Sequence, residues 1–381
     1  MGMIGGGQGA FIGAVHRMAA ALDGHIELVC GAFSSNAETS KATGRDLYLP
    51  ESRVYGNYHD MFEKEKALPA GERMDFVTIV TPNHLHFKPA MMALEMGFHV
   101  VIDKPITFSL EEARTLKSKV EQTGLLLCLT HTYTGYPMVK QAREMIKAEV
   151  LGNVRKVVVE YPQGWLTAPI EQEGQKQAGW RTDPARSGKT GAMGDIGTHA
   201  ENLAEYITGL HITEVCADLN TIVPGRQLDD NGTVLLRFNN GAKGLLYASQ
   251  IAAGEENELK IRVYGERGGL EWQHSDPNSL IIKWLDLPKE VYRSGSNYPF
   301  LANEALHNSR LPAGHPEGYL EAFANLYRNF ALALSKVIQG QQPDPITLDF
   351  PGVNEGIRGM AFIDAIVESA ASNQKWIKIT E

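Results

Sequence analysis

The stretch from Phe98 to Pro105 constrains the fold of this chain more than any other. It begins with a short apolar, β-branched run at residues 98–102, which is typical of a strand buried on both faces. The run ends in Asp103, Lys104 and Pro105, and proline cannot donate a hydrogen bond to a sheet. Ligands of open α/β sheets bind beyond the carboxyl ends of the strands. We therefore expect Asp103 and Lys104 at a binding edge, where a partly desolvated lysine suits proton transfer.

Similar apolar runs recur through the first third of the chain, and most are followed by a segment with helical spacing. The expected strands are residues 1–4, 26–33, 75–80, 98–102 and 125–130. The expected helices are residues 14–22, 58–67, 89–96 and 109–123. Ser109 and Glu112 match a capping box at the start of the last helix. Strands that alternate with helices predict a parallel, doubly wound sheet.

A glycine-rich turn joins the first strand to the first helix. Gly5, Gly7 and Ala10 fit the G-x-G-x-x-A spacing, and Gly9 and Gly13 are additional small residues. Small residues let the backbone approach a pyrophosphate, and the following helix N-terminus favours negative charge. The turn therefore indicates a dinucleotide-binding unit.

The pattern changes after a helix predicted at residues 138–147. Consecutive strands with tight turns then predict an antiparallel sheet, with hairpin signals at residues 239–241 and 265–269. Long polar, irregular stretches are expected at residues 163–190 and 288–316, and helices at residues 319–338 and 353–372. The strands are expected at residues 154–161, 215–223, 233–238, 242–250, 259–264, 270–272, 280–284 and 376–379.

We therefore expect an α/β protein with two domains. Residues 1–130 are expected to form a dinucleotide-binding (Rossmann) domain. Residues 131–381 are expected to form an α+β domain with an open, mostly antiparallel sheet that binds the substrate and forms an oligomer. The predicted apolar face of this sheet, with Val234, Leu236 and Phe238, needs a cover. A second copy of the chain is one candidate cover, and helices of the same chain are the other.

Composition excludes several classes of protein. The chain has 381 residues, 43% of them hydrophobic and 21% charged, which is typical of a soluble globular protein of two domains. The net charge of -9 without a basic block argues against nucleic acid or an anionic membrane as the partner. No apolar run reaches the roughly 20 residues of a membrane span, and no signal peptide is visible, so a cytoplasmic location is expected.

The cysteines and histidines do not indicate a metal site. Cys30, Cys128 and Cys216 lie far apart in apolar runs and are interpreted as buried free thiols of a reducing compartment. His84 and His86 are two residues apart on a predicted loop. Two histidines without a third ligand do not form a zinc site, so we expect no metal.

A second group of chemically active residues lies near residue 200. Asp195 and His199 are four residues apart, so a helical turn puts both on one face. A carboxylate and an imidazole that converge are the parts of a proton relay, although a capping Asp and a core His would give the same pattern. The preceding polar stretch contains Trp180 and Arg181, which suit a polyol or an acid.

Four motifs in this order and spacing resemble the Gfo/Idh/MocA oxidoreductases over nearly the whole chain. They are the turn at residues 5–13, the segment Thr81-Pro82-Asn83-His84-Leu85-His86, Asp103-Lys104-Pro105 and Gly194-Asp195-Ile196-Gly197-Thr198-His199. Family members usually have Glu in place of Asp103. They often have an acid for the ribose where this chain has Ser34, so NAD and NADP both stay open.

The resemblance implies an active site between the two domains, with Lys104, Asp195 and His199 as catalytic residues. It also implies NAD or NADP as cofactor and a sugar, sugar derivative or inositol as substrate. From the one-sided sheet we expect a homo-oligomer, either a dimer or a tetramer. The expected cofactor-binding residues are Gly5, Gly7, Gln8, Gly9, Ala10, Phe11, Ser34, Ser35, Thr81, Pro82, Asn83, His86, Asp103, Lys104 and Tyr133. The expected substrate-binding residues are Lys104, Tyr133, Trp180, Arg181, Asp195, His199 and His315.

The expected reaction is hydride transfer between nicotinamide and a hydroxyl or keto carbon. His199 would accept the hydroxyl proton, and Lys104 would stabilise the developing alkoxide. Two other functions on the same scaffold remain as alternatives. One is an NAD-dependent enzyme that cleaves glycosidic bonds, and the other is a non-catalytic cofactor-binding regulator.

Overall fold

The computed structural model describes residues 1–381 as two compact units. The first unit comprises Met1–His131 and Phe323–Ile357, and the second comprises Thr132–Ala322 and Arg358–Glu381. The sequence predicts a boundary between two domains after residue 130. The compact units do not test this boundary, so it stays a prediction.

A five-stranded parallel sheet forms the centre of the first unit. Its order is β2-β1-β3-β4-β5, so the strand order reverses between β1 and β3, where dinucleotides bind in such folds. The strands are β1 (Gly2–Gly5), β2 (Cys30–Ala32), β3 (Phe76–Val80), β4 (His99–Ile102) and β5 (Leu127–Leu129). Every residue of β3 and β4 is buried, as expected for strands covered on both faces. The predicted parallel, doubly wound sheet is therefore confirmed.

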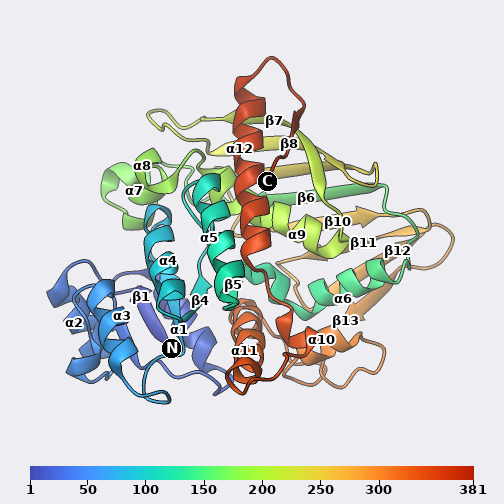
Figure 1. Ribbon diagram of the computed structural model, residues 1–381. Coiled ribbons are helices and arrows are strands. Elements are labelled where there is room, and N and C mark those ends of the chain that lie inside the picture. The colour runs from blue at the N-terminus through green and yellow to red at the C-terminus, as the bar shows by residue number, and fades with distance from the viewer. The chain divides into compact units, whose positions relative to one another are not determined.

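Helices alternate with these strands. They are α1 (Phe11–Ala21), α2 (Ala37–Asp46), α3 (Tyr58–Ala67), α4 (Phe87–Glu95) and α5 (Leu110–Thr123), of which α4 and α5 lie side by side (Figure 1). Ser109 caps α5 by accepting a hydrogen bond from the Glu112 N–H at 3.2 Å, which confirms the predicted cap. The Glu112 carboxylate accepts from the Phe108 N–H.

Two expectations for this unit were incomplete. The strand predicted at residues 26–33 is only three residues long as β2, because residues 26–29 do not join the ladder. Helix α2 was not predicted, since its sequence is mostly polar and has no apolar stripe. Its main sequence signal is the cap Asn36, which accepts a hydrogen bond from the Thr39 N–H at 3.0 Å.

A late segment of the chain completes the first unit. Helix α11 (Tyr319–Ile338) contributes its residues from Phe323 onwards to this unit. The Phe330 ring packs edge-to-face against Phe76 of β3, with ring centroids 5.0 Å apart. The Tyr327 hydroxyl is 3.2 Å from the Thr78 hydroxyl and 2.6 Å from Nδ1 of His16. The face of the sheet near α1 is thus closed by a helix distant in sequence.

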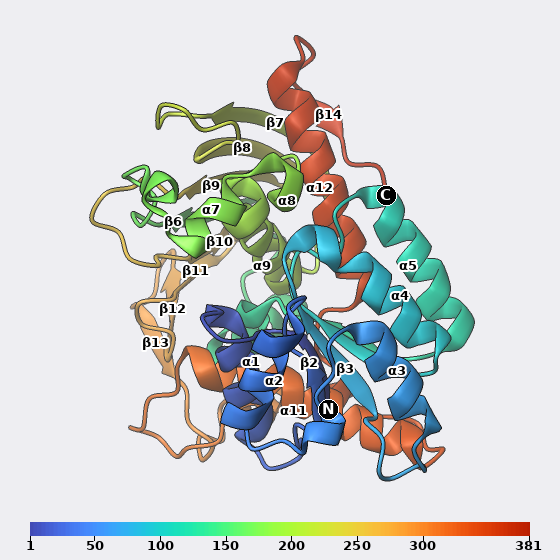
Figure 2. The same cartoon turned by 90° about the vertical axis from the view of Figure 1, so that its left-hand side faces the viewer.

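A nine-stranded sheet forms the second unit, in the order β13-β12-β11-β10-β6-β9-β8-β7-β14 (Figure 2). All neighbours are antiparallel except β6 and β9, which are parallel, so the predicted mostly antiparallel sheet is confirmed. The strands are β6 (Lys156–Pro162), β7 (Ile212–Asn220), β8 (Asn231–Phe238), β9 (Lys243–Ser249), β10 (Lys260–Tyr264), β11 (Gly268–Gln273), β12 (Ser279–Trp284), β13 (Glu290–Arg293) and β14 (Ile377–Lys378).

Helices of the same unit cover one face of this sheet. They include α6 and α9, which contact its strands (Figure 1). Val234, Leu236 and Phe238 are at most 3% exposed in the core below them. Of the two candidate covers, helices of the same chain therefore cover these three side chains, and a second copy of the chain is not needed for them. The helices are α6 (Pro137–Lys147), α7 (Lys176–Arg181), α8 (Pro184–Ser187), α9 (Thr198–Thr208), α10 (Asn303–His307) and α12 (Val353–Ala371), the last from Arg358 onwards.

The stretches expected to be irregular contain short elements. Residues 163–190 hold α7 and α8, and residues 288–316 hold β13 and α10. These elements are four to six residues long, too short for a periodic apolar pattern. Cys30 and Cys128 are buried free thiols as predicted. Cys216 is only half-buried, because its side chain alternates away from the core face of β7.

No helix of the structure is long and apolar enough to cross a membrane. No group of three or more His, Cys, Asp or Glu side chains is arranged to hold a metal ion.

Candidate functional site

The glycine turn after β1 has the shape of a pyrophosphate cradle. Gly5, Gly6 and Gly9 have positive φ angles of 85°, 70° and 75°, which favour glycine. A Cβ atom on Gly7 would lie 2.8 Å from the Phe33 carbonyl oxygen, and one on Gly13 would lie 2.3 Å from the Gly6 Cα. These positions accept no larger residue without rearrangement. The turn therefore lets a ligand approach the backbone closely.

The start of α1 adds hydrogen-bond donors to this cradle. Ala10 occupies the cap position, and no side chain accepts a hydrogen bond there. Backbone N–H groups of the first helical turn have no partner within the helix, and the helix dipole favours an anion beside them. An eleven-residue helix that begins directly after the glycine turn therefore fits a dinucleotide phosphate.

Other expected cofactor residues surround the turn. The Gln8 amide donates to Asp46 Oδ2 at 2.6 Å, and Phe11 is 65% exposed at the start of α1. Ser34 is half-buried just after β2, and its hydroxyl accepts from the Asn36 N–H at 3.1 Å. Ser35 is exposed beside it.

The segment after β3 is held by a buried histidine. His86 is 1% exposed, and its two ring nitrogens lie 2.7 Å from the Pro105 carbonyl oxygen and 2.8 Å from the Thr81 carbonyl oxygen. Burial lowers the pKa of His86. This histidine thus ties the turn containing Thr81 and Pro82 to the turn after β4. Asn83 is buried in the same turn.

Asp103 and Lys104 lie at the carboxyl end of β4, the edge at which they were expected. Asp103 Oδ1 accepts from its neighbour's N–H at 2.9 Å and from the Thr130 hydroxyl at 3.0 Å. Both side chains are half-buried, and the Lys104–Pro105 peptide bond is cis.

Asp195 in the second unit is held by two donors that its sequence neighbours do not supply. It lies in a π-helical turn, Met193–Gly197, that leads directly into α9. Its Oδ2 accepts from Arg181 Nε at 3.1 Å and from the Gln250 amide at 2.8 Å. Because one oxygen carries both bonds, the carboxylate has a fixed orientation.

Arg181 is itself held by aromatic rings. Its guanidinium carbon lies 4.4 Å from the ring centre of Trp180 and 5.8 Å from that of Trp165, within the range of cation–π attraction. Its Nη1 donates to Gln177 at 2.6 Å. The structure thus brings Trp180, Arg181 and Asp195 together. His315, by contrast, is exposed and lies 3.3 Å from the Pro312 carbonyl oxygen.

His199 lies on the first turn of α9 against two tyrosine rings. Its ring is perpendicular to that of Tyr133 at 5.0 Å between centroids, and it is 6.4 Å from that of Tyr161. The tyrosine hydroxyls contact each other, and both bond the Asn257 side-chain amide. Tyr133 was expected at the site. Tyr161, Asn257 and Gln250 were not, because nothing in the local pattern distinguishes them from other polar residues.

The catalytic residues expected from the sequence are therefore distributed over both units. Lys104 belongs to the first unit with the glycine turn, and Asp195 and His199 belong to the second, as does the expected binding residue Tyr133. Within each unit, a carboxylate and a basic side chain lie on short segments at the ends of regular elements. This composition can bind hydroxyl groups and move protons.

Comparison with known proteins assigns both units to described families. Residues 1–133 match the model described as "Oxidoreductase family, NAD-binding Rossmann fold", and residues 139–271 match the "GFO/IDH/MocA C-terminal domain". The chain is similar to the uncharacterized oxidoreductase YfiI of Bacillus subtilis, with 33% identity over 99% of this chain and 95% of that protein.

Two crystal structures are similar over nearly the whole chain. An oxidoreductase from Sinorhizobium meliloti is 46% identical, with a TM-score of 0.88 over 99% of this chain and 98% of that chain. An inositol dehydrogenase homolog from Azotobacter vinelandii, complexed with NADH and myo-inositol, is 34% identical. Its TM-score is 0.90 over 99% of this chain and 96% of that chain.

Proposed function

Because the chain belongs to the GFO/IDH/MocA family of oxidoreductases, we propose that it is an NAD(P)-dependent dehydrogenase of a polyol. It transfers a hydride between the cofactor and a hydroxyl-bearing carbon of a sugar, sugar derivative or inositol. The observation that carries this proposal is the glycine cradle of the first unit together with the fixed Asp195 and adjacent His199 of the second.

The cofactor-binding role follows from the cradle. Gly5, Gly7, Gly9 and the uncapped start of α1 would hold the pyrophosphate, with Ser34 near the adenosine ribose. When bound, the nicotinamide supplies the hydride acceptor. The remaining chemistry is proton transfer and charge stabilisation by the chain's own side chains.

The proton chemistry is assigned to two residues. We expect His199 to accept the substrate hydroxyl proton, because imidazole exchanges protons near neutral pH. We expect the Lys104 ammonium to donate a hydrogen bond to the oxygen as negative charge develops on it. Asp195, held by Arg181 and Gln250, accepts a hydrogen bond from a substrate hydroxyl.

The choice between NAD and NADP is assigned to Ser34. A serine hydroxyl accommodates either cofactor, whereas a carboxylate would repel a 2′-phosphate. Ser34→Asp is therefore expected to raise the preference for NAD over NADP, measured as the ratio of kcat/KM values. An unchanged ratio would place the ribose elsewhere.

We also propose a homo-oligomer in a reducing, cytoplasmic compartment. The free thiols Cys30 and Cys128 support the compartment. The face of the sheet opposite the helices supports the oligomer, because Leu235 is 47% exposed there. Oligomer size is not assigned.

The proposed reaction is tested with a panel of sugars and inositols, each with NAD and with NADP. Reduction is followed by absorbance of the reduced cofactor. Turnover of at least one polyol is the expected result. Glycoside cleavage without net cofactor reduction would favour the glycoside-cleaving alternative. Cofactor binding without any turnover would favour the regulator.

A further inference from the structure

Two buried tyrosines and a half-buried asparagine of the second unit form a closed ring of hydrogen bonds. The Asn257 amide nitrogen donates to the Tyr133 hydroxyl at 3.1 Å. The Tyr161 hydroxyl donates to Asn257 Oδ1 at 2.8 Å, and the two hydroxyls contact each other. Tyr133 is 4% exposed and Tyr161 2%, so water does not compete freely for these bonds. The ring joins the segment after β5, the strand β6 and the loop before β10.

The direction of every bond in the ring follows from its neighbours. The Trp165 indole can only donate, and it bonds Gln163 Oε1 at 3.0 Å. The Gln163 amide nitrogen therefore faces Asn257 at 2.6 Å, and the atom that receives it must be Oδ1. This orientation leaves the Asn257 amide nitrogen to face the Tyr133 hydroxyl and His274 Nδ1, the latter at 3.2 Å.

The direction of the hydrogen bond between the two tyrosine hydroxyls is then determined. Since Tyr161 gives its proton to Asn257, Tyr133 must give its own proton to Tyr161. Burial raises the pKa of both phenols, so both keep their protons. The ring thus uses the hydroxyl protons of both tyrosines.

The ring holds the two aromatic side chains that border His199. Tyr133 meets the imidazole edge-to-face at 5.0 Å, and Tyr161 lies 6.4 Å from it. The edge-to-face contact with Tyr133 and the tilted contact with Tyr161, at 57°, together border the imidazole on two sides. If either tyrosine lost its hydrogen bond, the surface against which the imidazole rests would be free to move.

We propose that Asn257, Tyr133 and Tyr161 form a positioning frame that sets the orientation of the His199 imidazole. This inference rests on the proposed role of His199 as the base. Tyr133 acts through its ring, and its hydroxyl proton is directed at Tyr161 rather than at the substrate. The three residues work as one unit, because removal of any member opens the ring.

The test uses Tyr133→Phe, Tyr161→Phe, Asn257→Leu and the double variant Y133F/Y161F, assayed on a polyol that the wild type oxidises. Each single variant is expected to lower kcat about 10- to 100-fold with little change in KM, because a misoriented base slows only the chemical step. The double variant is expected to be no slower than either single variant, since the ring is already open.

A matched control is Tyr55→Phe. Tyr55 is also buried and its hydroxyl donates to Glu65 Oε1 at 2.8 Å, but it belongs to the first unit and contacts no member of the ring. Its loss should leave kcat unchanged. If Y133F raised KM while Y161F kept wild-type kcat, Tyr133 would act directly on the substrate and the frame would be refuted.

A second readout does not depend on a substrate. In the wild type, NMR of the ¹⁵N-labelled His199 side chain should show one sharp set of imidazole signals. Y161F should broaden or shift them, and Y55F should not. Wild-type inactivity on every polyol would refute the proposed function alone. Unchanged His199 signals in Y161F would refute the frame alone.

Discussion

At the scale of single residues, the side chains assigned to catalysis are held by contacts with their neighbours. Asp195 is fixed by Arg181 and Gln250, and His199 rests against Tyr133. Asp103, next to Lys104, is fixed by Thr130. These contacts orient hydrogen-bonding groups before a substrate binds, which is the condition for efficient proton transfer.

Lys104→Ala and His199→Ala are each expected to lower kcat by about 10²–10⁴-fold, the usual cost of losing a proton-transfer group. The loss in the double variant should fall well short of the product of the two losses, because both groups are proposed to act on one hydroxyl. Lys104→Arg should not restore activity, since a planar guanidinium does not replace an ammonium. Steady-state kinetics and NADH fluorescence titration measure turnover and cofactor binding separately. Retention of more than about a tenth of the activity in Lys104→Ala would contradict its assignment.

His99 gives a prediction about acid stability. Its Nδ1 accepts from the Leu126 N–H at 2.9 Å, and burial lowers the pKa of His99 to about 4. As the pH falls below about 6.5, His99 is protonated in the unfolded chain but stays neutral in the folded chain. Acidification therefore lowers the free energy of unfolding through this residue. The loss develops between the unfolded pKa and the folded value of about 4.

His99→Asn keeps an acceptor for the Leu126 N–H but does not titrate. From pH 7 to pH 5, the free energy of unfolding of this variant should therefore fall by about 2 kcal/mol less than that of the wild type. Urea unfolding at the two pH values measures this difference, and His25→Asn at an exposed position serves as control. Parallel curves for the wild type and His99→Asn would show that His99 does not contribute.

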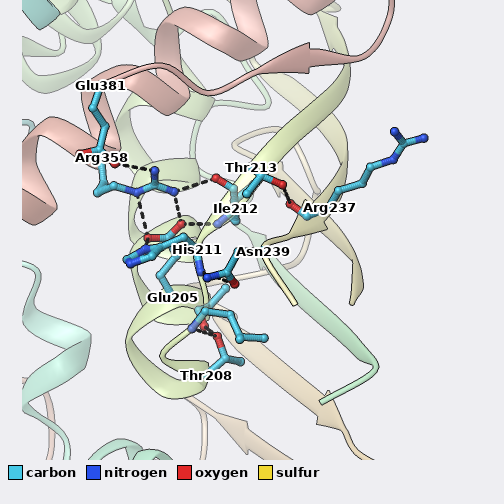
Figure 3. Close-up of polar contacts among 11 residues, drawn as sticks. Glu205, Thr208, His211, Ile212, Thr213, Arg237, Asn239, Arg358 and Glu381 are labelled. Carbon is cyan, nitrogen blue, oxygen red and sulfur yellow. Dashed lines mark hydrogen bonds and ion pairs between the residues drawn. The ribbon is translucent and has the colours of Figure 1, made fainter. Parts of the chain in front are cut away.

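At the scale of secondary-structure elements, the C-terminal residues are attached to the second unit by an arginine. Arg358 of α12 donates through Nε and Nη2 to Glu205 of α9 (Figure 3). It also donates to Glu381 at 2.8 Å and to the Ile212 carbonyl oxygen at 2.8 Å. Glu205 in turn accepts from the Ile212 N–H at 2.6 Å. These bonds connect α9, α12 and the first residue of β7.

Arg358→Met is expected to destabilise the protein by about 3 kcal/mol, because it leaves a nearly buried carboxylate without its charged partner. The Arg358 and Glu205 side chains are only 12% and 11% exposed. Lys189→Met is the matched control. Its ion pair with Asp364 of the same helix is 55% and 34% exposed, so its loss should cost less than about 1 kcal/mol. Equal losses in urea unfolding of the two variants would contradict a stabilising role of the Arg358–Glu205 ion pair.

At the scale of the whole molecule, the face of the nine-stranded sheet opposite the helices presents an apolar row that the same chain does not bury completely. Cys216, Leu235, Leu245 and Val158 are register neighbours across β7, β8, β9 and β6, and they form a row on the face opposite the helices. Arg262 continues the row on β10 and pairs with Glu160 at 2.9 Å. An apolar row with charged groups at one end suits a contact between copies of the chain.

Leu235→Glu is expected to convert the proposed oligomer into a monomer, because it puts a charge in the centre of the apolar row. Light scattering after size exclusion at micromolar concentration measures the mass. Ile222→Glu, at another exposed apolar position 57% accessible, should leave the mass unchanged. A wild type that is already monomeric would contradict the oligomer.

The sequence by itself determined the elements whose signal is local. The buried strands β3 and β4 and the helices α3 and α5 followed from apolar periodicity and a cap. The glycine turn followed from spacing alone, because positive φ angles and close packing require glycine.

Only the tertiary structure decided the contacts between distant residues. The closure of the first unit by α11, the parallel pairing of β6 with β9 and the bond from Gln250 to Asp195 all join segments far apart in the chain. Asn257 meets Tyr133 across 124 positions and Tyr161 across 96. Periodicity reports which face of an element is buried, but not which residue of another element lies against it. The candidate catalytic residues could therefore be named from the sequence, whereas the side chains that orient them could not.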